Sequence, residues 1–135
     1  MSARDEITTL LNRYSFTIDT GDIKGFLDLF EKGEWYMDGT TPNCGRQEIF
    51  DNVVSKVRIY ADGTPKTRHV TTNVELAIDE EAGTAKCQRY VTVLQQTDEL
   101  PLQPIFSVHY FDELDRKSTR LNSSHIQKSR MPSSA

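Results

Sequence analysis

The sequence predicts an α+β fold in which helices pack on one face of an antiparallel sheet. Three observations support this prediction. Apolar residues recur at helical spacing in the first half of the chain, they alternate with polar residues from Lys66 onward, and turn residues separate the segments. Helices followed by hairpin-connected strands are typical of this class. With 135 residues, of which 36% are hydrophobic, the chain fits one main domain.

Three helices are expected before Lys66. Ser2 is a suitable N-cap for the first, and Gly21 favours its termination. Its apolar stripe consists of Ile7, Leu10, Leu11, Tyr14 and Ile18. Asp22 caps a shorter second helix, whose apolar residues are Ile23, Phe26, Leu27 and Phe30. After a loop at residues 40–45, a third helix is indicated by Ile49, Phe50, Val53, Val54 and Val57.

Strands account for most of the remaining body. Residues 33–37 predict a short strand closed by the turn Asp38-Gly39. From Lys66 the period is two, with one face formed by Val70, Thr72, Val74, Leu76 and Ile78. The sequence Glu81-Ala82-Gly83 predicts a hairpin turn into a return strand at residues 84–96. A further strand is expected at 105–114, after a loop that contains two prolines.

Residues 115–135 differ in composition from residues 1–114. They contain five Lys/Arg, one Asp, six Ser and no aromatic residue, whereas residues 1–114 contain 11 Lys/Arg and 19 Asp/Glu. Such a polar segment buries too little apolar surface to offset the entropy lost on ordering. It also resembles the conceptual translation of a common sequencing adapter. We therefore expect a domain at 1–114 and a non-native, disordered tail at 115–135.

Composition excludes several classes of function. A formal net charge of −4 excludes a strongly basic nucleic-acid-binding protein. No apolar run approaches a membrane span, and the N-terminus lacks the apolar core of a signal peptide. Cys44 and Cys87 lie far apart with no metal-binding spacing, which is typical of reduced thiols. We expect a cytoplasmic protein with no metal, no redox cofactor, and no nucleic-acid or membrane partner.

Several segments, in this order and spacing, resemble the SnoaL-like branch of the nuclear-transport-factor-two-like superfamily. They are Tyr14–Asp22, Gly33–Gly39, Gly45-Arg46, His69–Leu76 and Phe106–Asp112. The resemblance covers residues 3–114. It implies a cystatin-like cone, with a curved sheet wrapped around the N-terminal helices and a pocket at the wide end. Because members of this family continue beyond residue 114, it also implies that the last strand or strands are missing.

The resemblance also implies a pair of candidate catalytic residues. Scytalone dehydratases and hexachlorocyclohexane dehydrochlorinases place an Asp at the end of the first helix and a His at the start of a central strand. These positions fall on Asp19 and His69. A carboxylate that fixes the imidazole tautomer makes histidine a good general base. The implied function is that of a cofactor-independent lyase, a dehydratase or dehydrohalogenase, acting on a small hydrophobic molecule.

Both residues also have structural interpretations. Asp19 lies where the helix dipole disfavours a carboxylate, but it is also a common turn residue. Strict alternation places His69 opposite Val70 and Val74, facing solvent unless the other face lines the pocket or a bulge changes the phase. We expect it to face the pocket.

Four further residues are candidates for the substrate pocket: Tyr14, Trp35, Tyr36 and His109. Tyr14 is equally compatible with the core. Trp35 and Tyr36 are adjacent on a strand, so one faces the core and the other faces outward. His109 faces either the cavity or the second face of the sheet. Arg89 is expected to pair with Glu75 across the hairpin.

An alternative to catalysis is a non-catalytic binding or assembly subunit, because the same fold provides the small subunit of aromatic-ring dioxygenases and fold alone does not determine function. In either case, the sheet face not covered by helices exposes apolar positions, which predicts a homodimer.

Overall fold

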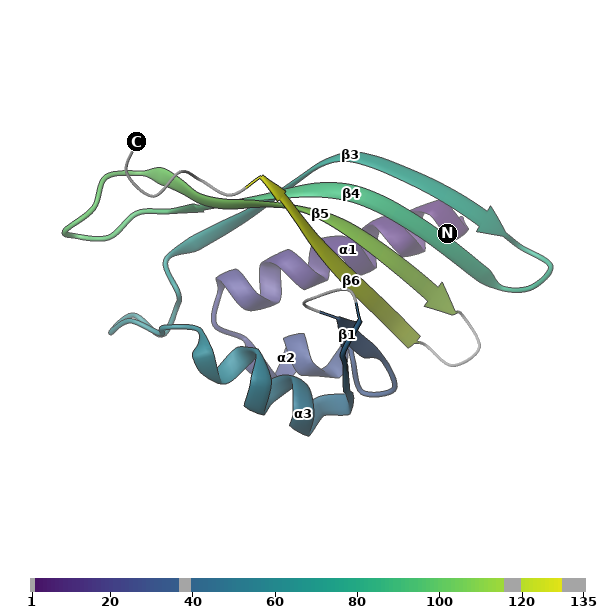
Figure 1. The fold of residues 1–135 in the computed structure, drawn as a ribbon, viewed down its shortest axis with the longest axis horizontal. Coiled ribbons are helices and arrows are strands. Elements are labelled where there is room, and N and C mark those ends of the chain that lie inside the picture. The colour runs from purple at the N-terminus through teal and green to yellow at the C-terminus, as the bar shows by residue number, and fades with distance from the viewer. Residues whose placement is uncertain (1, 37–39, 116–119, 130–135) are drawn as a thin grey trace.

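The computed structural model describes residues 2–36, 40–115 and 120–129, the last of these as a backbone strand (Figure 1). Residues 37–39, where the sequence predicts the Asp38-Gly39 turn, lie outside the described residues. The helical elements are α1 (Ala3–Asp19), α2 (Ile23–Asp28), α3 (Gly45–Asn52) and a 3₁₀ turn, η1 (Val54–Lys56). The strands are β1 (Glu34–Tyr36), β2 (Pro42–Cys44), β3 (Thr67–Asp79), β4 (Thr84–Gln95), β5 (Gln103–Asp115) and β6 (Arg120–Ser129). This order confirms the α+β prediction.

The strands form one curved sheet in the order β2-β1-β6-β5-β4-β3. β3 to β6 are paired antiparallel, and β1 runs parallel to β6. All helices lie on the concave side, with α1 crossing beneath the long strands (Figure 1). The curved sheet over N-terminal helices is the cystatin-like arrangement that the resemblance implied.

The N-terminal helices form where the sequence predicts them. The Asp5 amide donates to Ser2 Oγ (3.1 Å), which caps α1, and the Asp22 side chain caps α2. Gly21, with φ of 77°, reverses the chain after α1 in a conformation that favours glycine. In the described part of the chain, no helix is long and apolar enough to cross a membrane.

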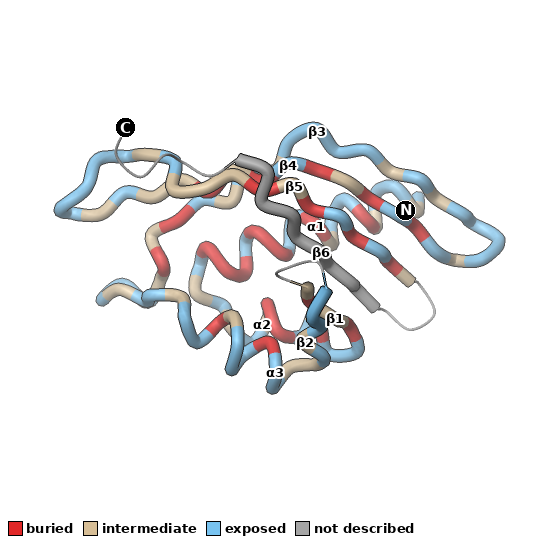
Figure 2. The backbone as a smooth tube through the Cα atoms, viewed as in Figure 1, coloured by how far each residue is buried: buried red, intermediate tan, exposed pale blue. Residues whose placement is uncertain are grey.

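The core lies between α1, α2 and the concave face of the sheet (Figure 2). Its centre is a cluster of aromatic rings in which Tyr14 stacks on Trp35 (centroids 5.6 Å apart) and contacts Phe26 and Phe30. These four side chains are buried, and burial of their apolar surface stabilises the contact between helices and sheet.

A bulge in β3 corrects the predicted alternation of that strand. The register shifts between Thr72 and Glu75, and Asn73 adopts a φ of 56°. Thr67 and His69 face inward before the bulge, and Leu76 and Ile78 pack against the core after it. Val70 and Val74 therefore face outward, 40% and 45% exposed, so the prediction of one continuous apolar face was wrong.

The segment after β5 also differs from the expectation. Residues 120–129 do not form a disordered tail: their backbone forms β6, which occupies the place of the strand that we expected to be missing, between β5 and β1. Without β6, the edge of β5 would present unpaired amide and carbonyl groups. Any extended segment can form hydrogen bonds with them, because backbone pairing depends little on the side chains. Residues 116–119 and 130–135 lie outside the described residues. The non-native origin of residues 115–135 stays a prediction.

Candidate active site

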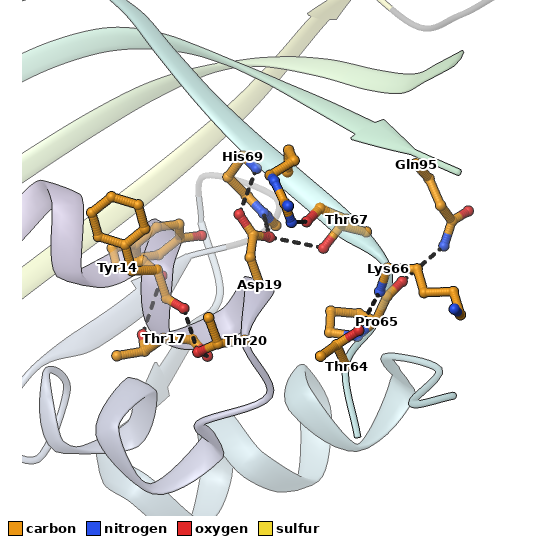
Figure 3. A network of polar contacts seen from close by, with 12 residues as sticks. Tyr14, Thr17, Asp19, Thr20, Thr64, Pro65, Lys66, Thr67, His69 and Gln95 are labelled. Carbon is orange, nitrogen blue, oxygen red and sulfur yellow. Dashed lines mark hydrogen bonds and ion pairs between the residues drawn. The ribbon is translucent and has the colours of Figure 1, made fainter. Parts of the chain in front are cut away.

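Asp19 is the last residue of α1, and its side chain reaches β3 (Figure 3). The carboxylate is buried and accepts three hydrogen bonds. Thr67 Oγ1 donates to Oδ1 (2.8 Å), the His69 backbone amide donates to Oδ2 (2.7 Å), and His69 Nδ1 lies 2.6 Å from Oδ1. A buried carboxylate is stabilised only when its oxygens are satisfied in this way. The predicted helix-end carboxylate and strand histidine are therefore in direct contact.

His69 projects from β3 toward the helices, and its side chain is 12% exposed. Because a carboxylate accepts the hydrogen bond at Nδ1, the neutral form of this imidazole carries its proton on Nδ1 and its lone pair on Nε2. Among the described residues, no hydrogen bond engages Nε2. The arrangement is that of a general base whose tautomer and orientation are fixed by a carboxylate.

A cavity of about 650 Å³ opens beside this pair. Its wall includes His69, Tyr14, Trp35 and Tyr110, and most of the remaining described lining is aliphatic or aromatic. Asp19 is not part of this wall, because it lies behind His69. The volume is in the range of sites that bind small organic molecules.

Two phenols meet at the cavity wall. The hydroxyls of Tyr14 and Tyr110 lie 3.2 Å apart, and the rings of Tyr14 and His69 are in edge contact (centroids 6.1 Å apart). Burial raises the pKa of Tyr14 well above its ordinary value and raises that of Tyr110 to about 12. Both phenols are therefore neutral near pH 7, and because one hydroxyl donates to the other, the pair keeps one further proton for a hydrogen bond.

Arg89 lies behind these phenols. Sequence reasoning predicted a hairpin contact with Glu75, but Glu75 instead accepts from Gln88. Arg89 is buried, donates from Nε to Asp112 Oδ2 (2.8 Å), and places its guanidinium carbon 5.1 and 4.8 Å from the ring centres of Tyr14 and Tyr110.

The alternation of the strands contained a signal for this pair. On β4, Arg89 falls in the inward phase with Ala85, Cys87, Val91 and Val93, and on β5 Asp112 falls in phase with Val108, Tyr110 and Leu114. An arginine and an aspartate in the apolar phase of neighbouring strands predict a buried ion pair.

The other pocket candidates divide evenly. Tyr14 and Trp35 line the cavity, as proposed from the sequence. Tyr36 is not among the described lining residues; its hydroxyl donates to Glu34 instead. His109 faces the outer side of the sheet, where it stacks on Phe111 (4.3 Å between centroids) and pairs with Gln88. Both assignments to the pocket were wrong, because strand alternation turns each side chain to the opposite face from its inward neighbour.

The described residues do not bring three His, Cys, Asp or Glu side chains together in a group that could hold a metal ion. Cys44 is exposed, Cys87 is buried, and both are free thiols. The described wall of the cavity offers acid–base and hydrogen-bonding groups at His69, Tyr14 and Tyr110.

Comparison with known families identifies the domain that contains these residues. The profile of the SnoaL-like domain matches residues 1–125. The chain belongs to the SnoaL-like family. No curated protein sequence matches the chain significantly. The family suggested by the sequence segments is thereby confirmed, and the SnoaL-like domain includes the dyad and the cavity.

Solved structures share the fold of this SnoaL-like chain at low sequence identity. A cystatin-like protein of unknown function from Nostoc punctiforme is 18% identical, with a TM-score of 0.75 over 98% of this chain and 97% of its own. A candidate scytalone dehydratase from Novosphingobium aromaticivorans is 16% identical, with a TM-score of 0.68 over 96% and 86%. The β subunit of a candidate aromatic-ring-hydroxylating dioxygenase from the same organism is 14% identical, with a TM-score of 0.71 over 96% and 91%. At these identities the likeness establishes the fold alone.

Proposed function

We propose that this SnoaL-like protein is a cofactor-independent lyase that eliminates water or halide from a small hydrophobic molecule. The observation that carries the proposal is the Asp19–His69 pair, with Nδ1 held at 2.6 Å and Nε2 left for a substrate at the wall of an apolar cavity. Neighbours of the same fold include a candidate scytalone dehydratase, which is compatible with a lyase of this kind.

The proposed reaction begins with proton transfer. His69 Nε2 takes a proton from a substrate carbon, and the C–H electron pair becomes the new C=C bond as the leaving group departs from the adjacent carbon. In a dehydration, the His69 imidazolium returns its proton to the departing hydroxyl group, which leaves as water. In a dehydrohalogenation, halide leaves as the anion and the imidazolium releases its proton to solvent. Asp19 stabilises the imidazolium that forms. General-base catalysis of this kind contributes about 100- to 10,000-fold in rate.

The phenols supply a second function in this proposal. Where the substrate carries a carbonyl next to the acidic carbon, abstraction of the proton places negative charge on the carbonyl oxygen. A neutral Tyr14 or Tyr110 hydroxyl donates a hydrogen bond to that oxygen and stabilises the enolate. Because the donors are positioned before the reaction, little reorganisation is needed as the charge develops.

A non-catalytic binding or assembly role is the second candidate. The contacts from Thr67 Oγ1 and the His69 amide to Asp19 also tie α1 to β3, which is a structural function in itself. The dioxygenase β subunit shares this fold. A binding or assembly role does not depend on proton transfer at His69 Nε2, whereas the lyase does. This difference distinguishes the two candidate functions.

The test compares two histidines of one sheet. Bicyclic β-hydroxy ketones and chlorinated cyclohexanes serve as probe substrates, followed by the absorbance of the conjugated product and by chloride release. We expect His69→Ala to lower kcat by about 100- to 10,000-fold, since the base is removed. His109→Ala, on the outer face, is the matched control and is expected to retain full activity. Unchanged turnover in His69→Ala would exclude the mechanism and favour the binding role.

A further inference from the structure

The mouth of the cavity differs in charge from its interior. Among the described residues that line the cavity, only Lys56 and Arg58 are exposed. They therefore mark the place where the cavity meets solvent. Lys56 ends η1, and Arg58 follows it on the strand-free segment that leads to β3. The guanidinium of Arg58 lies over the ring of Tyr60, 4.7 Å from its centre, which holds it near the mouth.

This cationic mouth lies in a segment with the opposite charge to the chain as a whole. Residues 53–68 contain four Lys/Arg and one Asp, in a protein of formal net charge −4. The single carboxylate, Asp62, is engaged by Lys66 (3.6 Å) and by Thr64. Lys56 and Arg58 make no ion pair with any described carboxylate. Their charge is therefore directed to solvent and to whatever enters the cavity.

The interior beyond the mouth is mostly apolar, and its described lining carries no charged side chain other than the His69 imidazole when it is protonated. Val54, Val93, Ile105 and Phe106 line it, and no carboxylate appears among the described lining residues. Gln95, the one carboxamide in the described lining, donates to the carbonyl of Pro65. A ligand that fits this arrangement has an apolar body, for the interior, and a negative group at one end, for the mouth.

We propose that the cavity binds an amphiphilic organic anion, a hydrophobic carboxylate whose charged end lies between Lys56 and Arg58. Its apolar body extends inward toward His69, which brings carbon atoms rather than the carboxylate to Nε2. Such anions are the substrate class of the proposed lyase, and their role as substrates rests on that proposed function. The binding preference itself is independent of turnover and is tested without it.

Trp35 provides the readout, because it is the only tryptophan in the chain and lines the cavity. Its fluorescence is titrated with octanoate, 1-octanol and octylammonium, which share one alkyl chain and differ in charge. We expect octanoate to bind about twofold to fivefold more tightly than 1-octanol, the range that an exposed ion pair typically contributes. We expect octylammonium to bind more weakly than either. The octanoate preference is expected to fall as salt rises from about 0.02 to 0.5 M.

Two double variants test whether Lys56 and Arg58 cause the tighter binding of octanoate. Lys56→Gln/Arg58→Gln is expected to abolish the difference between octanoate and 1-octanol. The control variant Arg13→Gln/Lys86→Gln changes the net charge by the same amount, at exposed sites that are not part of the described cavity wall. It is expected to keep the difference in affinity between octanoate and 1-octanol. Thermal unfolding checks that both double variants are folded.

The proposal is overturned if octanoate shows no saturable binding, if 1-octanol binds as tightly as octanoate, or if the octanoate preference survives in Lys56→Gln/Arg58→Gln. Loss of turnover in His69→Ala with octanoate binding retained leaves this proposal standing, so the two proposals fail separately.

Discussion

His69 Nδ1 and Asp19 Oδ1 lie 2.6 Å apart, although 50 positions separate the two residues in the chain. The contact joins the C-terminal end of α1 to β3 and leaves Nε2 at the wall of the cavity. It places a carboxylate where the helix dipole alone would disfavour one. The compensating hydrogen bonds come from Thr67 Oγ1, from the His69 backbone amide and from His69 Nδ1.

Asp19→Asn tests the role of the carboxylate in orienting the base. An asparagine amide fits the same space, but it no longer stabilises the imidazolium, and its NH₂ group competes to donate to Nδ1. By analogy with the Asp-to-Asn change in the serine-protease triad, kcat is expected to fall by about 10,000-fold at most. Steady-state kinetics with the probe substrates measure this effect. Asp22→Asn is the control, because asparagine caps α2 as well as aspartate does, and it is expected to leave kcat and stability nearly unchanged. Equal kcat in Asp19→Asn and wild type would show that the carboxylate is only structural.

Tyr110 gives a prediction about alkaline pH. Burial raises its pKa to about 12, whereas in the unfolded chain it titrates near 10. The unfolded state therefore loses this proton first, and stability falls as pH rises from about 10 toward 12. The melting temperature, measured across this interval, is expected to drop less steeply in Tyr110→Phe than in wild type. Tyrosine absorbance should show late ionisation in the native wild-type protein. Ionisation of all tyrosines near pH 10 in the folded protein would contradict the prediction.

The Arg89–Asp112 pair is expected to dominate the polar contribution to core stability. Asp112→Asn leaves a buried guanidinium without its counter-charge, at a cost of about 3–5 kcal/mol in the free energy of unfolding. Replacing both residues, as in Arg89→Met/Asp112→Leu, is expected to recover part of that loss. Urea denaturation measures these differences.

The exposed ion pair between Arg46 and Asp28 is the matched control for this experiment. Arg46→Met is expected to leave the urea midpoint nearly unchanged, because solvent screens that pair. A similar loss from Arg46→Met and Asp112→Asn would contradict a special role for burial.

The outer face of the sheet carries a cluster of Tyr90, His109 and Phe111, with Tyr90 46% exposed. Val70 and Val74 lie on the same outer face, because the bulge in β3 leaves both side chains facing outward. We predict that two copies of the chain pair through this face as a homodimer, since burial of exposed apolar area favours association. Sedimentation equilibrium is expected to show a dimer for wild type and a monomer for Tyr90→Glu. Phe16→Glu, at an exposed aromatic on α1, should leave the dimer intact. A monomeric wild type at micromolar concentration would refute the prediction.

The sequence alone determined the three helices and the strands β1, β3, β4 and β5, but it did not predict β2 or β6. Ser2, Gly21 and Asp22 fix the ends of α1 and α2 through local hydrogen bonds and backbone preferences, which depend only on near neighbours. Period-two alternation located β3, β4 and β5. The resemblance that these segments carry also identified Asp19 and His69.

Only the tertiary structure decided which face each side chain occupies and which distant residues meet. The bulge near Asn73 reverses the phase of β3, so His69 faces the cavity and Val70 faces outward. The partner of Arg89 lies on the neighbouring strand, a pairing that depends on the register between β4 and β5. Local periodicity cannot specify such contacts, because a shift of a single residue in register moves every side chain of a strand to the other face.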